Sequence, residues 1–349
     1  MSDITSLSSL SSEEDNEQPR RNRRIRHIRD RSDPFIEFDA TDFRMRFKFR
    51  KETVLEILRR FEHPITPASK RNKAISPLNQ LLITLRFYAT GAFQNCLGDH
   101  IHISQPSVSR IIARITRCIA HRSNIEIRMP DPNESVQVCS DFYGIANFPR
   151  VVGAIDCTHI KITSPGGENA ELYRNRKGYF SINVEAVCDA HLIIRHIVAR
   201  WPGSVHDATI FNDGPLPVNF QGGRHGANNF LLGDSGYPCK LFLLTPRLHP
   251  RTPAEVAYNT AHKKTRNTVE RCFGVLKKRF PCLSFGLRTK MTTTVAIIVA
   301  CAVLHNMAIK LGDYEEEPEE YLLEEIHNDN EEHVGGNTAM RNYIINNFF

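Results

Sequence analysis

Two acidic residues stand where the sequence pattern predicts a strand or a strand end. Asp156 interrupts the apolar, β-branched run VVGAIDCTHIKI at 151–162. Asp234 ends the hydrophobic run NFLLGD, and Gly236 and Pro238 then turn the chain away. A carboxylate in such a strand costs free energy unless a positive charge lies beside it. Because open sheets bind ligands at the carboxyl ends of their strands, Asp156 and Asp234 are candidates for one site.

Glu270 is a third candidate, on a predicted helix. Across 259–280 apolar residues recur at helical spacing, and Glu270 falls at the edge of the apolar stripe with Arg266 and Lys277. The alternative is an ordinary Arg266–Glu270 pair on a solvated face, which contributes about 0.3–0.5 kcal/mol. Carboxylates are the oxygen ligands that Mg²⁺ and Mn²⁺ prefer. Two such ions roughly 4 Å apart can activate a nucleophile and stabilise the leaving oxygen of a phosphodiester.

The elements that must position these carboxylates read as a sheet covered by helices. Three strands with short connections, near 151–162, 181–190 and 192–201, predict an antiparallel meander. A helix start at 203–211, a strand at 229–234 and a long helix ending near 280 follow. Strands that then alternate with helices indicate a mixed sheet in an α/β or α+β layer structure.

The chain before this sheet is predicted to be all-helical. Segments near 51–61, 77–90 and 106–121 have apolar residues at three- and four-residue spacing. Between the last two, Gly98 can close a short helix and Ser104 can cap the next, which is the pattern of a helix-turn-helix. Side chains near the start of the longer helix can reach base edges or phosphates; they are Gln105, Ser107, Arg110 and Arg114. The alternative is a packed helix with a solvated basic face.

The charge distribution points to a polyanionic partner. The net charge is +6, residues 20–31 hold seven arginines, and the last forty residues are strongly acidic. A basic body suggests nucleic acid or an acidic protein. The arginine run can be a nuclear-import signal or a phosphate-gripping arm, and both charged runs can also be solvated tails. The predicted organisation is a disordered basic arm at 1–33, a helical domain at 34–128, a domain built on the predicted sheet at 129–312 and an acidic tail at 313–349.

Several classes of protein are disfavoured by composition. The apolar stretch at 295–309 is too short for a membrane span, and we expect a buried helix there. No signal peptide is visible. Nine cysteines without CxxC spacing argue for a reducing compartment and against disulfides or a zinc finger. His159, His206 and His305 are read as structural, because histidine is not what Mg²⁺ selects, and Asn306 has no interpretation from sequence.

Six ordered blocks resemble those of the PIF/Harbinger transposases and the nucleases derived from them, from about residue 75 to residue 310. They are GAIDCTHI, LYRNRKGYFSINVEAVCDA, WPGSVHDATIF, LLGDSGYP, AYNTAHKKTRNTVERCFGVLKKRF and ACAVLHNMAI. The resemblance implies an RNase H-like core whose Asp, Asp, Glu site falls on Asp156, Asp234 and Glu270, with 35 residues between the last two. Asp207 also matches an acidic position and is a candidate outer ligand. Phosphate positioning is expected of the loop cations Arg174, Arg176 and Lys177.

These features together predict an endonuclease that cleaves, and can also join, DNA with two divalent cations, Mg²⁺ or Mn²⁺. The resemblance implies a Myb-like accessory protein, and a homo-oligomer is a further expectation. The predicted location is the nucleus, with the cytoplasm as a second site. One alternative is a catalytically silent DNA-binding or chromatin factor that kept the fold. A hydrolase of small phosphate esters also fits a metal site but leaves the basic body unexplained.

Overall fold

The computed structural model describes residues 33–66, 74–100, 102–226, 228–313 and 337–349. The predicted basic arm, with its arginine run, lies outside these residues except for Asp33, and so do the acidic residues between 314 and 336. The strand bounds are β1 Val151–Lys161, β2 Ser181–Cys188, β3 Ile194–Pro202, β4 Phe230–Leu232 and β5 Leu243–Leu244. The helix bounds are α1 Pro34–Glu37, α2 Ala40–Phe47, α3 Lys51–Ile65, α4 Pro77–Thr90, α5 Gln94–His100, α6 Gln105–Ala120, α7 Ser123–Glu126, α8 Pro132–Ala146, α9 Asp207–Asn212, α10 Leu216–Gln221, α11 Pro253–Arg279, α12 Cys282–Phe285, α13 Met291–Lys310 and α14 Ala339–Phe348, with a 3₁₀ turn at Ala170–Tyr173.

The strands form one mixed sheet in the order β3-β2-β1-β4-β5. The first three strands pair antiparallel, as predicted, although the connection from β1 to β2, residues 162–180, is longer than expected; β4 and β5 run parallel to β1 and to each other. In the register of β1 and β4, Ala154 lies opposite Leu232. The expected mixed α/β sheet is therefore confirmed, and it places β1 and β4 side by side.

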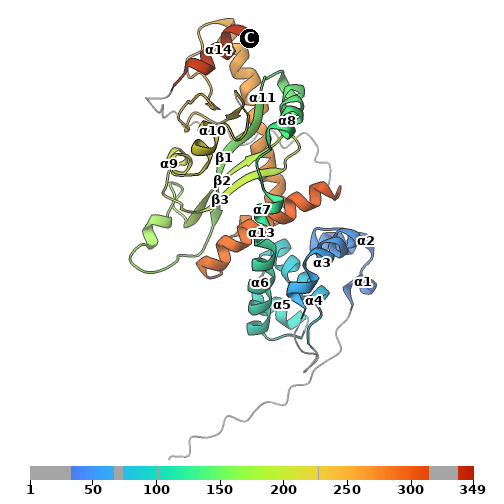
Figure 1. Ribbon diagram of the computed structural model, residues 1–349. Coiled ribbons are helices and arrows are strands. Elements are labelled where there is room, and N and C mark those ends of the chain that lie inside the picture. Colours follow the sequence, from blue (N-terminus) through green and yellow to red (C-terminus); the bar gives the residue numbers. More distant parts are fainter. Residues whose placement is uncertain (1–32, 67–73, 101, 227, 314–336) are drawn as a thin grey trace, which may run out of the picture. The chain divides into compact units, whose positions relative to one another are not determined.

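Helices cover both faces of the sheet (Figure 1). On one face residues of α9 and α10 pack in one cluster with residues of β1, β2 and β4; the cluster includes Phe211, Leu216, Phe220, Val152, Ile155, Val187 and Leu231. On the other face the apolar stripe of α11, which includes Val269 and Leu276, packs with α13 against the strands. Because successive strand residues point to opposite faces, neighbours in β1 enter different layers of the core.

The segment predicted to form a helix-turn-helix departs from that prediction at Gly98 and at Ser104. The short helix α5 runs to His100, so Gly98 lies inside it and does not end it. A Cβ at Gly98 would lie 2.4 Å from the carbonyl oxygen of Ile103, so the turn requires a residue without a side chain. Ser104 is the N-cap residue of α6 but makes no capping bond, because its hydroxyl contacts Ser107 Oγ at 3.0 Å instead.

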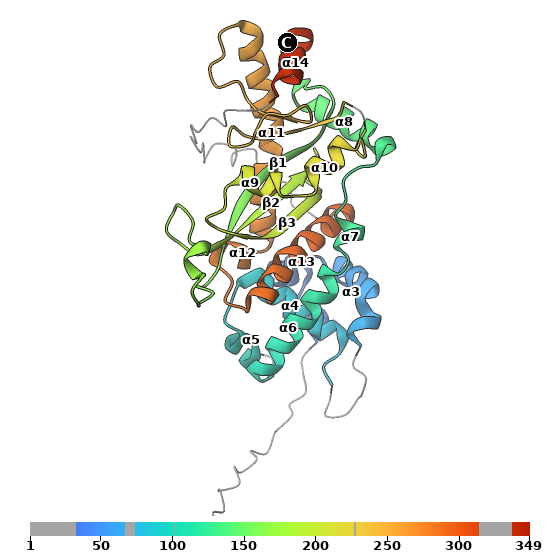
Figure 2. The same cartoon turned by 60° about the vertical axis from the view of Figure 1, so that its left-hand side comes forward.

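The predicted buried helix at 295–309 is α13. The helix is longer than the stretch judged too short from sequence, and by length and composition it could cross a membrane, but 67% of its most apolar window is buried inside the protein. In both views α13 lies between the sheet and the N-terminal helices (Figures 1 and 2). Its buried Asn306 accepts from the backbone N–H of Ile194 at 2.8 Å and donates to the carbonyls of Ile194 and Glu126. Asn306 is thus a structural amide that joins α13 to β3 and α7.

The segment predicted as an acidic tail contains ordered structure at both of its ends. Asp313 is fully buried and accepts from the backbone N–H of Arg50 at 2.7 Å. Near the C-terminus α14 buries Ile344 and Ile345 against the core that α8 and α11 also line. These two contacts could not be predicted from the composition of the segment, because the acidic residues between them dominate it.

Candidate active site

Asp156 lies in the middle of β1, on the side of the sheet that α11 covers. One carboxylate oxygen accepts from the backbone N–H of Cys157 at 2.8 Å, and the other accepts from the Arg266 guanidinium at 3.0 Å. Burial raises the pKa of Asp156 to about 8, and the negative charges of Asp234 and Asp207 add to that rise, while Arg266 opposes it. The sequence predicted that a carboxylate within this strand would cost free energy without a positive charge beside it. The Arg266 guanidinium supplies that charge and offsets part of the cost.

Glu270 and Arg266 lie one turn apart on α11, at the rim of the sheet. The same Arg266 guanidinium that contacts Asp156 also donates to Glu270. Burial disfavours the charged form of Arg266, but the surrounding carboxylates outweigh burial and raise its pKa above the ordinary value. The simple i, i+4 pair considered from sequence is therefore present, and it is one half of a bridge to Asp156.

Asp234 follows β4 in a tight turn. Its side chain accepts from the backbone N–H of Gly236 at 3.0 Å, which fixes the turn, and β4 ends two residues before it at Leu232. Since Leu232 lies opposite Ala154, the chain brings Asp234 toward Asp156, two residues further along each segment. The charge of Asp234 acts on the pKa of both Asp156 and Arg266. The turn therefore presents a carboxylate at the carboxyl end of β4.

Asp207 is the first residue of α9. Its carboxylate accepts from the side-chain amide of Asn183 in β2 at 2.9 Å, and the Asn183 amide also donates to the carbonyl of Val205. Its negative charge contributes to raising the pKa of Asp156 and of Glu185. Asp207 thus belongs electrostatically to the same region, on a side chain that Asn183 orients.

The donor set and the charge balance fit a divalent cation. All four acidic side chains offer oxygen atoms, and a single guanidinium balances the charge between Asp156 and Glu270. In the part of the chain that the structure describes, no three His, Cys, Asp or Glu side chains are close enough to hold an ion as they stand. The Arg266 guanidinium contacts oxygens of both Asp156 and Glu270 in this structure, and the Glu270 side chain is 41% exposed.

The loop cations expected to position phosphate have intramolecular partners. Arg174 donates to Glu171 at 2.7 Å and to the carbonyl of Gly178, and its guanidinium lies over the Phe180 ring. Arg176 contacts the ring of His206 at 2.7 Å. Lys177 is exposed in the same turn. The structure therefore places these three side chains on one loop between β1 and β2.

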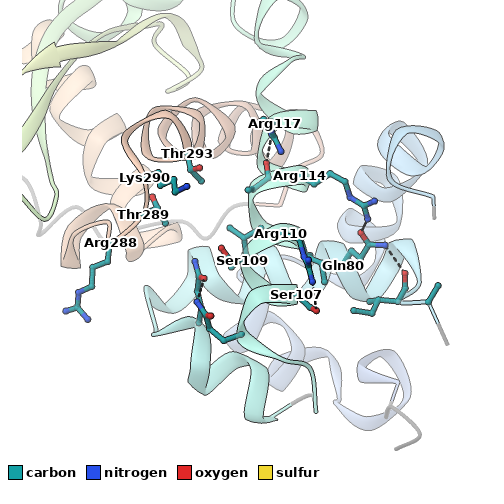
Figure 3. Close-up of a pocket in the computed structure, with 17 residues that line it drawn as sticks. Gln80, Ser107, Ser109, Arg110, Arg114, Arg117, Arg288, Thr289, Lys290 and Thr293 are labelled. Carbon is teal, nitrogen blue, oxygen red and sulfur yellow. Dashed lines mark hydrogen bonds between the residues drawn. The ribbon is translucent and has the colours of Figure 1, made fainter. Parts of the chain in front are cut away.

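The DNA-binding candidates of α6 gather elsewhere. Gln105, Ser107, Arg110 and Arg114 line a groove that includes none of the four acidic residues (Figure 3). The three histidines contact protein groups: His159 Nδ1 lies 3.1 Å from Ser181 Oγ, His206 Nδ1 lies 2.7 Å from the Arg176 guanidinium, and His305 Nε2 lies 2.8 Å from the carbonyl oxygen of Leu192. The chain thus presents an acidic region on the sheet and a basic groove on its helices.

Glu185 is a buried acid that the sequence reading missed. It lies opposite Cys157 in β2, is fully buried, and neither carboxylate oxygen has a hydrogen-bond partner within the described structure. Burial, and then the charge of Asp207, raises the pKa of Glu185 to about 8. The signal was available, because SINVEAVC carries an acid inside an apolar strand just as β1 does.

Comparison with known proteins places these residues in a recognisable context. A family model described as "DDE superfamily endonuclease" matches residues 155–306. The Homo sapiens protein named "Putative nuclease HARBI1" is 36% identical over 280 residues, which are 78% of this chain and 80% of that protein. The Arabidopsis thaliana protein named "Antagonist of like heterochromatin protein 1" is 27% identical over 263 residues, 70% of this chain and 65% of that protein. A chain in the crystal structure of a pre-cleavage Mos1 transpososome has 12% identity and a TM-score of 0.19, over 81% of this chain and 95% of that one.

Proposed function

Because the chain belongs to the DDE-superfamily endonucleases that include the harbinger transposase-derived nucleases, we propose that it cleaves DNA phosphodiester bonds with divalent cations held by Asp156, Asp234 and Glu270. The observation that carries the proposal is the electrostatic convergence of these three side chains. Asp156 and Glu270 share the Arg266 guanidinium, and the charge of Asp234 acts on both Arg266 and Asp156. Separate elements therefore supply acidic groups to one region.

Each residue has a distinct part in this proposal. Asp156 is the rigid member, because its strand is buried and one of its oxygens is held by a backbone N–H. Asp234 is placed by a turn that its own side chain stabilises. Glu270 can change its side-chain conformation most easily, since it is more exposed than Asp156, the other carboxylate that Arg266 contacts. Mg²⁺ or Mn²⁺, when bound, would supply Lewis-acid activation of a water or hydroxyl and charge stabilisation of the leaving oxygen.

Arg266 links two of the proposed ligands. Its guanidinium donates to both Asp156 and Glu270, and it opposes the rise that burial causes in the pKa of Asp156. If Glu270 turned to a cation, Arg266 would still lie beside Asp156 and could contact a phosphate oxygen, which guanidinium groups bind readily. Asp207, held by Asn183, is proposed as an outer acidic residue of the same site.

The finer features of the proposal rest on sequence and fold together. The strand order β3-β2-β1-β4-β5 supports an RNase H-like core. The succession of α5, a turn and α6 supports a helix-turn-helix-like DNA-binding segment. The arginine run at 20–31 supports action in the nucleus. A Myb-like accessory protein and a homo-oligomeric state are proposed on the family resemblance.

A plasmid-nicking assay tests the proposal. Purified full-length protein is incubated with supercoiled plasmid and Mg²⁺ or Mn²⁺, and a parallel reaction contains EDTA. Asp156→Asn, Asp234→Asn and Glu270→Gln are each expected to abolish nicking while their thermal unfolding remains cooperative. Glu52→Gln, which removes an exposed acid on α3, is the matched control and should nick like the unsubstituted protein.

Two outcomes would contradict the proposal. Full nicking by any of the three acidic-site variants refutes the assignment of that residue. Unsubstituted protein that binds DNA but nicks it with neither cation refutes the nuclease function, and it supports the catalytically silent DNA-binding alternative instead.

A further inference from the structure

The basic groove of α6 is lined by distant parts of the chain. It encloses about 840 Å³. The polar side of α6 lines it, the segment 288–293 at the start of α13 forms a second wall, as Figure 3 shows, and Ile75, Gln80 and Gln94 add to the lining. The cations that line the groove are Arg110, Arg114 and Arg117 on α6 and Arg288 and Lys290 on the opposite wall. Its described lining contains no aspartate or glutamate.

Most of these cations have no carboxylate to balance them within the described structure. Arg110 donates to the hydroxyl of Ser107 at 3.3 Å, and Arg117 donates to the carbonyl of Ala113 in its own helix. Arg288 and Lys290 are exposed. Five positive side chains around one concave surface raise the local positive potential, which attracts a polyanion and is screened by salt.

Arg288 is held at the mouth of the groove by an exposed aromatic ring. Its guanidinium lies 4.3 Å from the centre of the Phe93 ring, and Phe93 is 62% exposed. Exposed cation–π contacts of this kind contribute roughly 0.5–1 kcal/mol. Phe93 also lines a smaller adjoining pocket with Arg288 and Gln105. Phe93 is therefore a positioning residue for the cation at the end of the groove.

The neutral lining selects among polyanions. Hydroxyl groups from Ser107, Ser109, Thr289 and Thr293 face the groove together with glutamine amides. Hydroxyls, amides and guanidinium groups are the donors that contact phosphate and sugar oxygens in protein–DNA complexes. The described lining of this groove has no aromatic side chain, and the Phe93 ring beside it already carries the Arg288 guanidinium on one face, so the groove lacks the row of rings on which proteins stack the bases of single strands.

We propose that the groove binds the phosphodiester backbone of duplex DNA, with Arg288 and Lys290 completing a site that α6 begins. This inference rests on the proposed function, which makes DNA the substrate. It also assigns a role to α6 that differs from free insertion into a major groove. Ile111 and Ile115 of α6 are buried in the core, and its polar side faces the opposite wall, so its arginines contact phosphates and fix the position of the duplex.

The test measures binding of a fluorescently labelled duplex to the full-length protein by anisotropy across a salt series. The double variant Arg288→Ala/Lys290→Ala should bind more weakly, and the slope of log affinity against log salt should fall by about 2, roughly 0.9 for each lost phosphate contact. The matched control Arg224→Ala/Arg251→Ala removes two exposed arginines outside the groove and should keep the original affinity and slope. Phe93→Leu should weaken binding by less than the double variant.

The outcomes separate this inference from the nuclease proposal. Groove variants that bind duplex with unchanged affinity and salt slope overturn the groove and leave the nuclease proposal standing. Loss of single-strand binding with duplex binding intact also overturns it. Protein that never nicks plasmid but whose duplex binding depends on Arg288 and Lys290 supports the groove alone. In an active protein, the groove variant should raise the DNA concentration needed for half-maximal nicking, whereas Asp156→Asn should bind duplex normally.

Discussion

Replacing Glu185 with glutamine should stabilise the protein, and the gain should grow with pH. Glu185 is fully buried and neither of its oxygens has a hydrogen-bond partner in the described structure. His196 Nε2 lies 3.8 Å from Glu185 Oε1, too far for a hydrogen bond. Burial lowers the pKa of His196 to about 4 and raises the pKa of Glu185 to about 8, so both side chains are neutral near pH 7 despite their proximity.

The magnitude follows from the difference between the folded and unfolded states. In the unfolded chain Glu185 has its ordinary pKa of 4.5, so between that value and about 8 the folded protein holds a proton that the unfolded chain has released. Folding stability therefore falls as pH rises through this window, by about 1.4 kcal/mol per pH unit. Glutamine does not titrate, so from about pH 5 to about pH 7 the stability of Glu185→Gln relative to the unsubstituted protein should rise by roughly 2.7 kcal/mol.

Urea unfolding followed by the fluorescence of the single tryptophan, Trp201 on β3, measures this difference. Other groups that titrate in both proteins cancel, because only the difference between the two stability curves is used. Glu168→Gln, which replaces an exposed glutamate, is the control and should run parallel to the unsubstituted protein. Parallel curves for Glu185→Gln itself would show that Glu185 is ionised in the folded state, and the neutral assignment would then be wrong.

Two further substitutions test the packing around the sites. Asn306→Ala removes the partner of three buried backbone groups and should destabilise the protein by about 3 kcal/mol or more, measured by urea unfolding; a loss below about 1 kcal/mol would contradict the structural role of Asn306. Gly98→Ala places a methyl group 2.4 Å from the carbonyl oxygen of Ile103, and it should cost about 1–3 kcal/mol and weaken duplex binding, whereas Gly144→Ala, with open space around its Cβ, should do neither.

The regular elements could be predicted from sequence because their patterns are local. Apolar residues at helical spacing predicted a helix at 77–90, and α4 has these bounds. Alternation and β-branched residues predicted the three antiparallel strands, and their bounds shifted by at most two residues at either end. Gly98 was wrongly predicted to end a helix. The reason for a glycine there is its close approach to the carbonyl oxygen of Ile103, which exists only in the folded turn and leaves no local sequence signal.

The site was harder to predict because its partners come from different elements. Helical spacing correctly paired Arg266 with Glu270, but it could not show that the same guanidinium also reaches Asp156, 110 residues earlier. Glu185 was missed although its sequence signal resembles that of Asp156. The two acids differ in their hydrogen-bond partners. Asp156 accepts from a guanidinium of α11, whereas Glu185 lies opposite Cys157 and accepts from no donor within the described structure.

The basic groove and the sheet depend on the same buried helix. Ile112 and Ile119 of α6 belong to one continuous core with Ile298 and Val303 of α13 and with Ala154 of β1. The predicted boundary between a helical domain and a nuclease domain therefore crosses a shared core. Since one wall of the groove leads directly into α13, and Asn306 of α13 holds β3, a displacement of α13 must change the groove and the sheet together.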